Sequence, residues 1–219
     1  MAGLTEMLRE KASYIWERIL EHPFVIELYT GRLPLEKFKY YVVQDYNYLI
    51  GMMRAFSLLA SRADYETARL ALEIAYADAT IEMDNYRRLL GELGLSFEDV
   101  VSAEPAPTNV GYMGFLVSTC ATSSPLECLV AVLPCFWSYE EIAMRHRDKL
   151  SSNPMRIYVE WAKTYLSREY HELVSRLRGA VDRLWDGGDT SKLERLFITA
   201  SRYEYMFWDM AYRMEKWPI

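Results

Sequence analysis

Cysteine and histidine are scarce in this chain, which has 219 residues and three of each. Cys120, Cys128 and Cys135 form no Cys-x-x-Cys pair, so the sequence supports neither a zinc ribbon nor a thioredoxin-type redox pair. An odd number of cysteines is typical of free thiols in a reducing compartment. We therefore expect three free thiols and a cytoplasmic location, with Cys120 and Cys128 in structural roles.

Long apolar runs and clustered positive charge are also missing. No uncharged apolar run approaches the length that spans a bilayer, although 51% of the residues are hydrophobic. Residues 1–20 carry charges throughout and lack the apolar core of a signal peptide. Basic and acidic residues are interleaved and the net charge is −6, so the positive surface that binds nucleic acid is absent. These absences argue against a membrane protein, a secreted protein and a nucleic-acid-binding protein.

The histidines lack the spacing of a metal site. His22, His146 and His171 are far apart, and no acidic residue stands three positions before His146 or His171. A di-iron site in a helical bundle needs several carboxylates with Glu-x-x-His spacing. The histidine spacing thus argues against a di-iron site, and it leaves open a haem protein in which His22 would be the candidate iron ligand.

Helical periodicity dominates what is present, and no hairpin signal separates alternating runs. We expect about nine helices in one all-α domain over residues 1–219, arranged as a multi-helix bundle. One helix should run from Pro125 to about Leu150, and the last from about Thr190 to Lys216. The predicted joints lie at 21–23, 30–34, 61–64, 91–96, 102–109, 151–154 and 185–191.

The segment "LPCFWSYEEI" combines a proline, a cysteine and aromatic residues inside one predicted helix. Ser124 and Pro125 form a good helix start, so Pro134 lies in the interior and should kink the helix. Cys135 and Tyr139 are four residues apart and share a helix face. The kink can direct the thiol into a pocket, but the cysteine and proline alone favour a buried, inert cysteine in a kinked core helix.

Two carboxylates stand among aromatic residues. Glu204, Phe207 and Trp208 lie on one face of the final helix, where burial would raise the carboxyl pKa and suit Glu204 to acid/base chemistry. The alternative is a solvated or ion-paired glutamate at the surface. Asp45, three residues before Tyr48, is a poor interior helix residue. A buried aspartate must be hydrogen-bonded or paired, so it supports either a structural network or a ligand.

Two tyrosines complete the candidate set. Tyr112 lies between Gly111 and Gly114, which allow either tight helix packing or close approach of a ligand. Tyr165, in "WAKTYLSREY", fits a core position or a pocket wall.

Together these segments resemble the TenA family, the cysteine-type thiaminase II enzymes that are also called aminopyrimidine aminohydrolases. The similarity spans nearly the whole chain, from "HPFVIELYTGRLPLEKFKYYVVQDYNYL" to "EYMFWDMAY", and "LPCFWSYEEI" is its most specific part. It implies a haem-oxygenase-like helical fold, a homotetramer, and hydrolysis of 4-amino-5-aminomethyl-2-methylpyrimidine to the hydroxymethyl pyrimidine and ammonia, with thiamine cleavage as a weaker activity. It implies no metal and no cofactor.

The resemblance also implies roles for individual residues. Cys135 matches the family nucleophile, Glu204 the acid/base, and Asp45 the carboxylate that binds the amino group of the pyrimidine. The residues that would line and close the substrate pocket are Tyr48, Tyr112, Tyr139, Tyr165 and Phe207. Two alternatives stay open: a related protein that acts on another pyrimidine, and a non-catalytic regulatory or ligand-binding protein.

Overall fold

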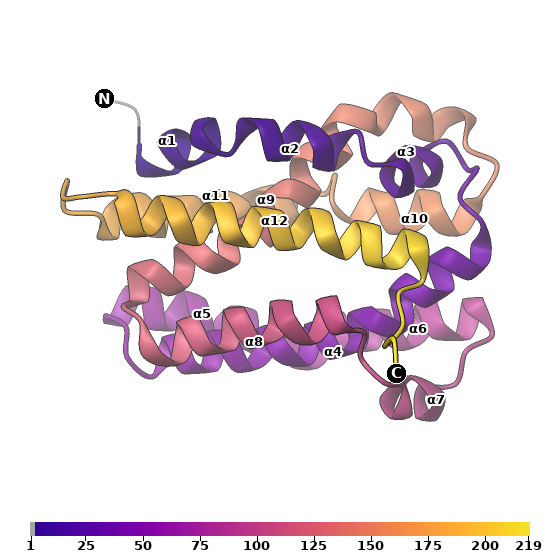
Figure 1. The fold of residues 1–219 in the computed structure, drawn as a ribbon, viewed down its shortest axis with the longest axis horizontal. Helices are drawn as coiled ribbons and strands as arrows, with labels where there is room; N and C mark the ends of the chain where they lie inside the picture. Colours follow the sequence, from indigo (N-terminus) through magenta and orange to yellow (C-terminus); the bar gives the residue numbers. More distant parts are fainter. Residues whose placement is uncertain (1–2) are drawn as a thin grey trace. The chain divides into compact units, whose positions relative to one another are not determined.

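The computed structural model describes residues 3–219, and among these residues it contains helices and no strand. This part of the chain forms twelve α-helices, one π-helix and one 3-10 helix, which confirms the all-α prediction but exceeds the nine helices expected. Contacts divide the chain into two compact units (Figure 1). None of the helices over residues 3–219 is both long enough and apolar enough to cross a membrane.

The first unit comprises the chain up to Pro34 and residues Leu129–Asp209. In it α1 packs against α11, and α3 packs against α10. Its complete helices are α1 (Leu4–Lys11), α2 (Ser13–Leu20), α3 (Pro23–Tyr29), η2 (Arg147–Ser152, 3-10), α10 (Arg156–Thr164) and α11 (Arg168–Leu184).

The second unit comprises Leu35–Cys128 and Met210–Ile219. The long helix α4 is its centre and packs against both α5 and α8. Its complete helices are α4 (Leu35–Ala60), α5 (Tyr65–Ala77), the π-helix η1 (Asp78–Glu82), α6 (Met83–Leu93), α7 (Phe97–Ser102) and α8 (Pro107–Thr122). The boundary after Cys128 falls inside α9 (Pro125–His146), and the boundary after Asp209 falls inside α12 (Ser191–Arg213).

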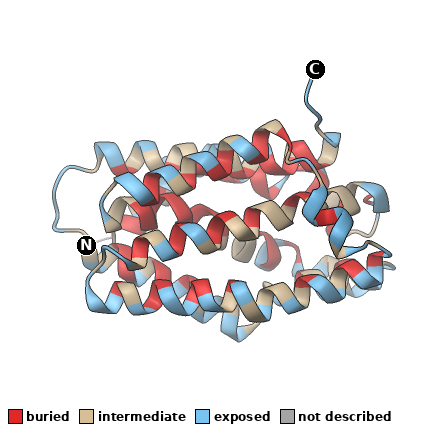
Figure 2. Cartoon of the chain, turned by 90° about the horizontal axis from the view of Figure 1, so that it is seen from below, coloured by how far each residue is buried: buried red, intermediate tan, exposed pale blue. Residues whose placement is uncertain are grey.

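Most helices bury one face and expose the other, as Figure 2 shows by colour. In α11 the buried face carries Val174, Leu177 and Val181, which recur at helical spacing. Burial of each such side chain stabilises the fold by roughly 1.5–3 kcal/mol. Amphipathic periodicity therefore accounts for the elements that the sequence predicts best.

The start of α9 is as predicted. The amide of Ser124 donates to Glu127 Oε2 over 3.0 Å, and the amide of Glu127 donates to Ser124 Oγ over 3.3 Å, which together make a capping box. Pro134 lies inside the helix, and since it has no N–H it cannot bond to the Val130 carbonyl. The α-helix ends at His146 and not near Leu150, because residues 147–152 tighten into a 3-10 turn.

Two other helix boundaries differ from the prediction. The first expected helix is divided at Ala12, where no breaker residue stands; Ala12 is fully buried and its backbone leaves the helical region. The last helix ends at Arg213 and not at Lys216, because Met214 adopts φ = 50°. The amide of Glu215 then donates to the Met210 carbonyl over 3.0 Å, which closes the helix end.

The prediction of three free thiols is wrong. Cys120 in α8 and Cys128 in α9 form a disulfide, with their Cα atoms 4.6 Å apart, and both are fully buried. The turn at Ser123 and Ser124 brings the last residues of α8 against the first of α9, which the sequence separation of eight residues does not reveal. Cys135 is the free cysteine.

Candidate active site

Cys135 and Glu204 belong to the first unit and are both buried. Cys135 is 9% exposed and Glu204 is 2% exposed, so the alternative of a solvated surface glutamate is wrong. The two residues come from α9 and α12 and share a neighbour, Tyr170 of α11. Burial raises the pKa of the Tyr170 hydroxyl well above its usual range, and the nearby Cys135 and Glu204 are among the groups that add to this. A thiol and a carboxyl group from two other helices therefore lie close enough to this phenol to affect its ionisation.

Aromatic rings form a wall in the same unit. The ring of Tyr139 lies 4.9 Å from that of Tyr165 and 5.0 Å from that of Trp208, measured between centroids. Trp161 of α10 lies 4.8 Å from Tyr165 and joins the same cluster. Such edge-to-face and tilted contacts hold rings rigidly. The structure thus groups the predicted Tyr139 and Tyr165 and adds Trp161, which the sequence analysis did not single out.

The face of α12 that carries Glu204 is buried as its spacing predicts. Phe207 is 4% exposed and Trp208 is 1% exposed. Trp208 also packs on Phe24 of α3, with ring centroids 5.2 Å apart. Aromatic side chains three and four residues after Glu204 keep this turn of the helix in an apolar environment.

The other predicted residues form a second group, in the second unit. Tyr48 of α4 and Tyr112 of α8 contact each other with ring centroids 5.6 Å apart. Their helices approach closely near Gly51, where an added Cβ would stand 2.2 Å from Met113 Sδ. The side-chain amide of Asn109 also donates to the backbone carbonyl of Gln44 over 2.8 Å, which fixes the position of α8 along α4.

Asp45 is part of a cluster of three carboxyl groups. Burial, with a contribution from Glu82, raises the pKa of Asp45 to about 7. Burial, Glu82 and Asp45 likewise raise the pKa of Asp78 to about 7. Asp78 and Glu82 are the first and last residues of the π-helix η1, which packs on α4. The sequence analysis missed both, although acidic residues four apart in "DATIE" were an available signal.

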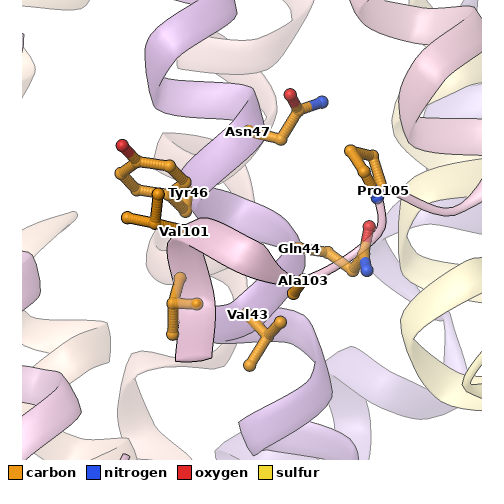
Figure 3. Close-up of a pocket in the computed structure, with 8 residues that line it drawn as sticks. Val43, Gln44, Tyr46, Asn47, Val101, Ala103 and Pro105 are labelled. Carbon is orange, nitrogen blue, oxygen red and sulfur yellow. The ribbon is translucent and has the colours of Figure 1, made fainter. Parts of the chain in front are cut away.

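A small hollow of about 140 Å³ lies beside α4, also in the second unit (Figure 3). Gln44 is one of the lining residues, and two hydrogen bonds fix its side chain: it accepts from the backbone amide of Ala106 over 2.9 Å and donates to the backbone carbonyl of Glu104 over 3.2 Å. None of the predicted site residues lines it. The lining residues are Val43, Gln44, Tyr46, Asn47, Val100, Val101, Ala103 and Pro105.

The histidines have structural partners. His22 caps α3, since its Nδ1 accepts from the Phe24 amide over 3.1 Å, and its Nε2 lies 3.7 Å from Asp209 Oδ1. His146 is buried, with its Nε2 2.7 Å from the Leu20 carbonyl. The candidate haem ligand therefore already serves as a helix cap. Over residues 3–219, no group of three or more His, Cys, Asp or Glu side chains is arranged to hold a metal ion.

Comparison with known proteins gives the same family throughout. The model of the TENA/THI-4/PQQC family matches residues 9–214. The aminopyrimidine aminohydrolase of Halalkalibacterium halodurans is 37% identical, over 96% of this chain and 96% of its own length. The aminopyrimidine aminohydrolase of Bacillus subtilis is 33% identical, over 97% of this chain and 91% of its own.

Solved structures agree on the fold. A TenA homologue from P. horikoshii OT3 superposes with a TM-score of 0.94 at 48% identity, covering 97% of this chain and 99% of that one. A haem-oxygenase-like domain from Shewanella denitrificans superposes with a TM-score of 0.80 over 98% of this chain and 94% of that one. At 15% identity this second likeness concerns the fold alone, and it confirms the predicted fold class.

Proposed function

Since this chain belongs to the TENA/THI-4/PQQC family, we propose that it is an aminopyrimidine aminohydrolase. Its substrate is 4-amino-5-aminomethyl-2-methylpyrimidine, and thiamine is a poorer substrate. Water replaces the amino group on the exocyclic methylene, which gives the hydroxymethyl pyrimidine and ammonia. The reaction is a salvage step for degraded thiamine and needs no cofactor.

Each predicted residue has a chemical role in this proposal. The Cys135 thiolate adds to the pyrimidine ring and supplies the electron pair that expels ammonia from the methylene carbon; the bond to sulfur breaks after water has added there. Glu204 donates a proton to the ring nitrogen and takes one back. Asp45 binds the amino group of the ring. The aromatic residues that bind the flat ring are Tyr48, Tyr112, Tyr139, Tyr165 and Phe207.

The observation that supports the proposal is the burial of both Cys135 and Glu204 in the first unit. Both are buried, both are neighbours of Tyr170, and the Tyr139–Tyr165 wall lies in the same unit. Burial in apolar surroundings favours the protonated form of a carboxyl group, which a general acid requires. A soft nucleophile, an acid and flat aromatic surfaces match what an electron-poor pyrimidine needs.

Ammonia release tests the proposal. Purified protein is incubated with the aminomethyl pyrimidine, its N-formyl derivative and thiamine. We expect release from the first, and Cys135→Ser and Glu204→Gln should each lower kcat by at least about a hundredfold. Tyr158→Phe, which removes a hydroxyl outside the proposed machinery, is the control and should keep its rate. No release by the wild type, or a full rate for Cys135→Ser, would contradict the proposal.

The proposal includes one catalytic domain over residues 1–219, a homotetramer and a cytoplasmic location. Exposed apolar side chains on α5 support the assembly. Tyr65, Leu72 and Tyr76 are 76%, 57% and 70% exposed, and their spacing places them on one helix face. Exposed apolar stripes of this kind mark protein interfaces.

A further inference from the structure

Tyr170 is a half-buried polar residue of the first unit to which the proposed mechanism gives no role. It lies in the first turn of α11, and the sequence explains why it is held there. Ser167 is the N-cap of that helix, and its Oγ accepts from the Tyr170 amide over 3.1 Å. This capping bond fixes the first turn of α11 and, with it, the backbone position of Tyr170.

The Tyr170 hydroxyl bonds to the helix that carries the thiol. It donates to the Phe136 carbonyl oxygen over 3.0 Å. Cys135 lies between Pro134 and Phe136 in the sequence. Because Pro134 has no N–H, this turn of α9 lacks the usual hydrogen bond to the Val130 carbonyl. A helix weakened at a proline is free to bend unless another group holds it. The tyrosine bond supplies a fixed point one residue beyond the thiol.

A second bond between the same two helices lies one turn further along. His171 Nδ1 and Glu140 Oε1 are 2.5 Å apart. Tyr170 and His171 of α11 thus bond to Phe136 and Glu140 of α9, one on each side of Tyr139 in the sequence. These two bonds fix how α9 and α11 are aligned along each other. The exposed pair contributes little by itself, because His171 is 74% exposed. The tyrosine bond, which is partly buried, is the stronger restraint.

The Tyr170 ring also fixes the aromatic wall. It meets Tyr165 edge to face, with centroids 5.1 Å apart and an interplanar angle of 90°. Tyr165 in turn contacts Tyr139, so one side chain restrains both the thiol-bearing turn and the neighbouring wall. Cys135 and Glu204 are both near enough to the hydroxyl to affect its ionisation.

We propose that Tyr170 is a positioning residue for the Cys135 thiol, acting through the Phe136 carbonyl. It holds the turn of α9 that follows Pro134 and provides a polar hydroxyl group near the sulfur. The inference rests on the proposed function for its meaning in catalysis, but its physical content, the reactivity of one thiol, can be measured without substrate.

The test uses Tyr170→Phe, which keeps the ring and removes only the hydroxyl. Tyr158→Phe is the control, because the Tyr158 hydroxyl also donates to a backbone carbonyl, that of Leu33, over 2.8 Å in the same unit. Both variants lose one hydrogen bond from a tyrosine hydroxyl to a backbone carbonyl, at a cost of about 1 kcal/mol each. Melting temperatures measured for both show whether the losses of stability match.

The first readout is alkylation of the native protein by iodoacetamide across a range of pH. The other two cysteines are joined in a disulfide, so the thiolate of Cys135 is the one that reacts, and mass spectrometry checks the site. Loss of the hydroxyl makes the surroundings of the sulfur less polar and disfavours the thiolate. We expect Tyr170→Phe to lower the alkylation rate at neutral pH about threefold or more and to move the pH profile upward, and Tyr158→Phe to match the wild type.

The second readout is steady-state kinetics on the aminomethyl pyrimidine. A misplaced nucleophile should lower kcat about tenfold with little change of KM in Tyr170→Phe. An alkylation rate that is unchanged or raised relative to Tyr158→Phe overturns the inference. Failure of the wild type to release ammonia would instead contradict the proposed function, and the alkylation result would still decide the role of Tyr170.

Discussion

The charge of Asp45 in α4 reaches Asp78 in η1, where it adds to the burial and to the Glu82 charge that raise the pKa of Asp78 to about 7. The Oδ2 atom of Asp78 is buried and has no hydrogen-bond partner among the described residues. Two carboxyl groups are therefore held where ionisation is unfavourable. A π-turn makes this possible, because its wider turn changes which side chains reach the neighbouring helix, and such turns are frequent at functional sites.

The cluster predicts a loss of stability with rising pH. Asp45 and Asp78 have pKa values raised from 3.8 to about 7, so between these values the folded protein binds more protons than the unfolded chain. Their contribution to stability is then most favourable below pH 4 and is lost as pH rises through 7. Asp78→Asn should therefore raise the free energy of unfolding by roughly 2 kcal/mol at pH 8 and change it little at pH 4.

Urea denaturation at the two pH values measures this difference. Asp84→Asn is the control, since Asp84 is exposed on α6 and should give the same small change at both. A lower stability of Asp78→Asn at pH 8 would mean that the carboxylate makes favourable contacts and that the cluster is not destabilising.

The features of the fold that the sequence predicts correctly are those that depend on residues close together in the chain. Ser124 and Glu127 form the expected capping box, and the periodic burial of α11 follows its pattern. The break at Ala12 and the Cys120–Cys128 disulfide depend on contacts between segments, for which a single sequence has no signal.

The candidate site shows the same division. The aromatic neighbours of Glu204 in the sequence predict its burial, whereas the role of Cys135 follows from the family resemblance; both residues are buried. Tyr170 and Asp78 were missed because their neighbours in sequence are ordinary; only the packing of α11 and η1 makes them notable.

From the Cys120–Cys128 disulfide we predict the number of reactive thiols and a loss of stability when the bond is removed. Under denaturing conditions one thiol per chain should react before reduction, and three should react after it. The bond closes a short loop with a sequence separation of 8, for which the chain-entropy estimate of stabilisation is about 2.5 kcal/mol. The double variant Cys120→Ala/Cys128→Ala should therefore unfold at lower urea concentration than the wild type. Three reactive thiols before reduction would show that the bond does not form.

Gly31 should tolerate no side chain. It has φ = +72°, and an added Cβ would stand 2.5 Å from both Asn153 Oδ1 and Pro154 Cδ. Asn153 also donates to the carbonyls of Leu28 and Tyr29, so displacing it uncaps the end of α3. Gly31→Ala should destabilise the protein by roughly 3 kcal/mol.

Gly94→Ala separates the two causes. Gly94 has a similar φ of +67° but nothing within 4 Å of an added Cβ, so only the backbone cost of about 1 kcal/mol applies. Thermal denaturation of both variants measures the difference, and equal losses would show that the contacts with Asn153 and Pro154 do not matter.

The exposed stripe on α5 predicts how assembly fails. Tyr65, Leu72 and Tyr76 expose apolar side chains on one face of α5, and burial of these side chains between subunits would stabilise an oligomer. A glutamate in that face would carry a charge into the interface and leave it unpaired there, at a cost of several kcal/mol. Leu72→Glu/Tyr76→Glu should therefore convert a tetramer to smaller species in light scattering after size exclusion, while its helical circular dichroism stays unchanged. Tyr14→Glu, at an exposed tyrosine of the first unit, should leave the mass unchanged. A wild type that is monomeric, or a double variant of unchanged mass, would show that α5 is not the interface.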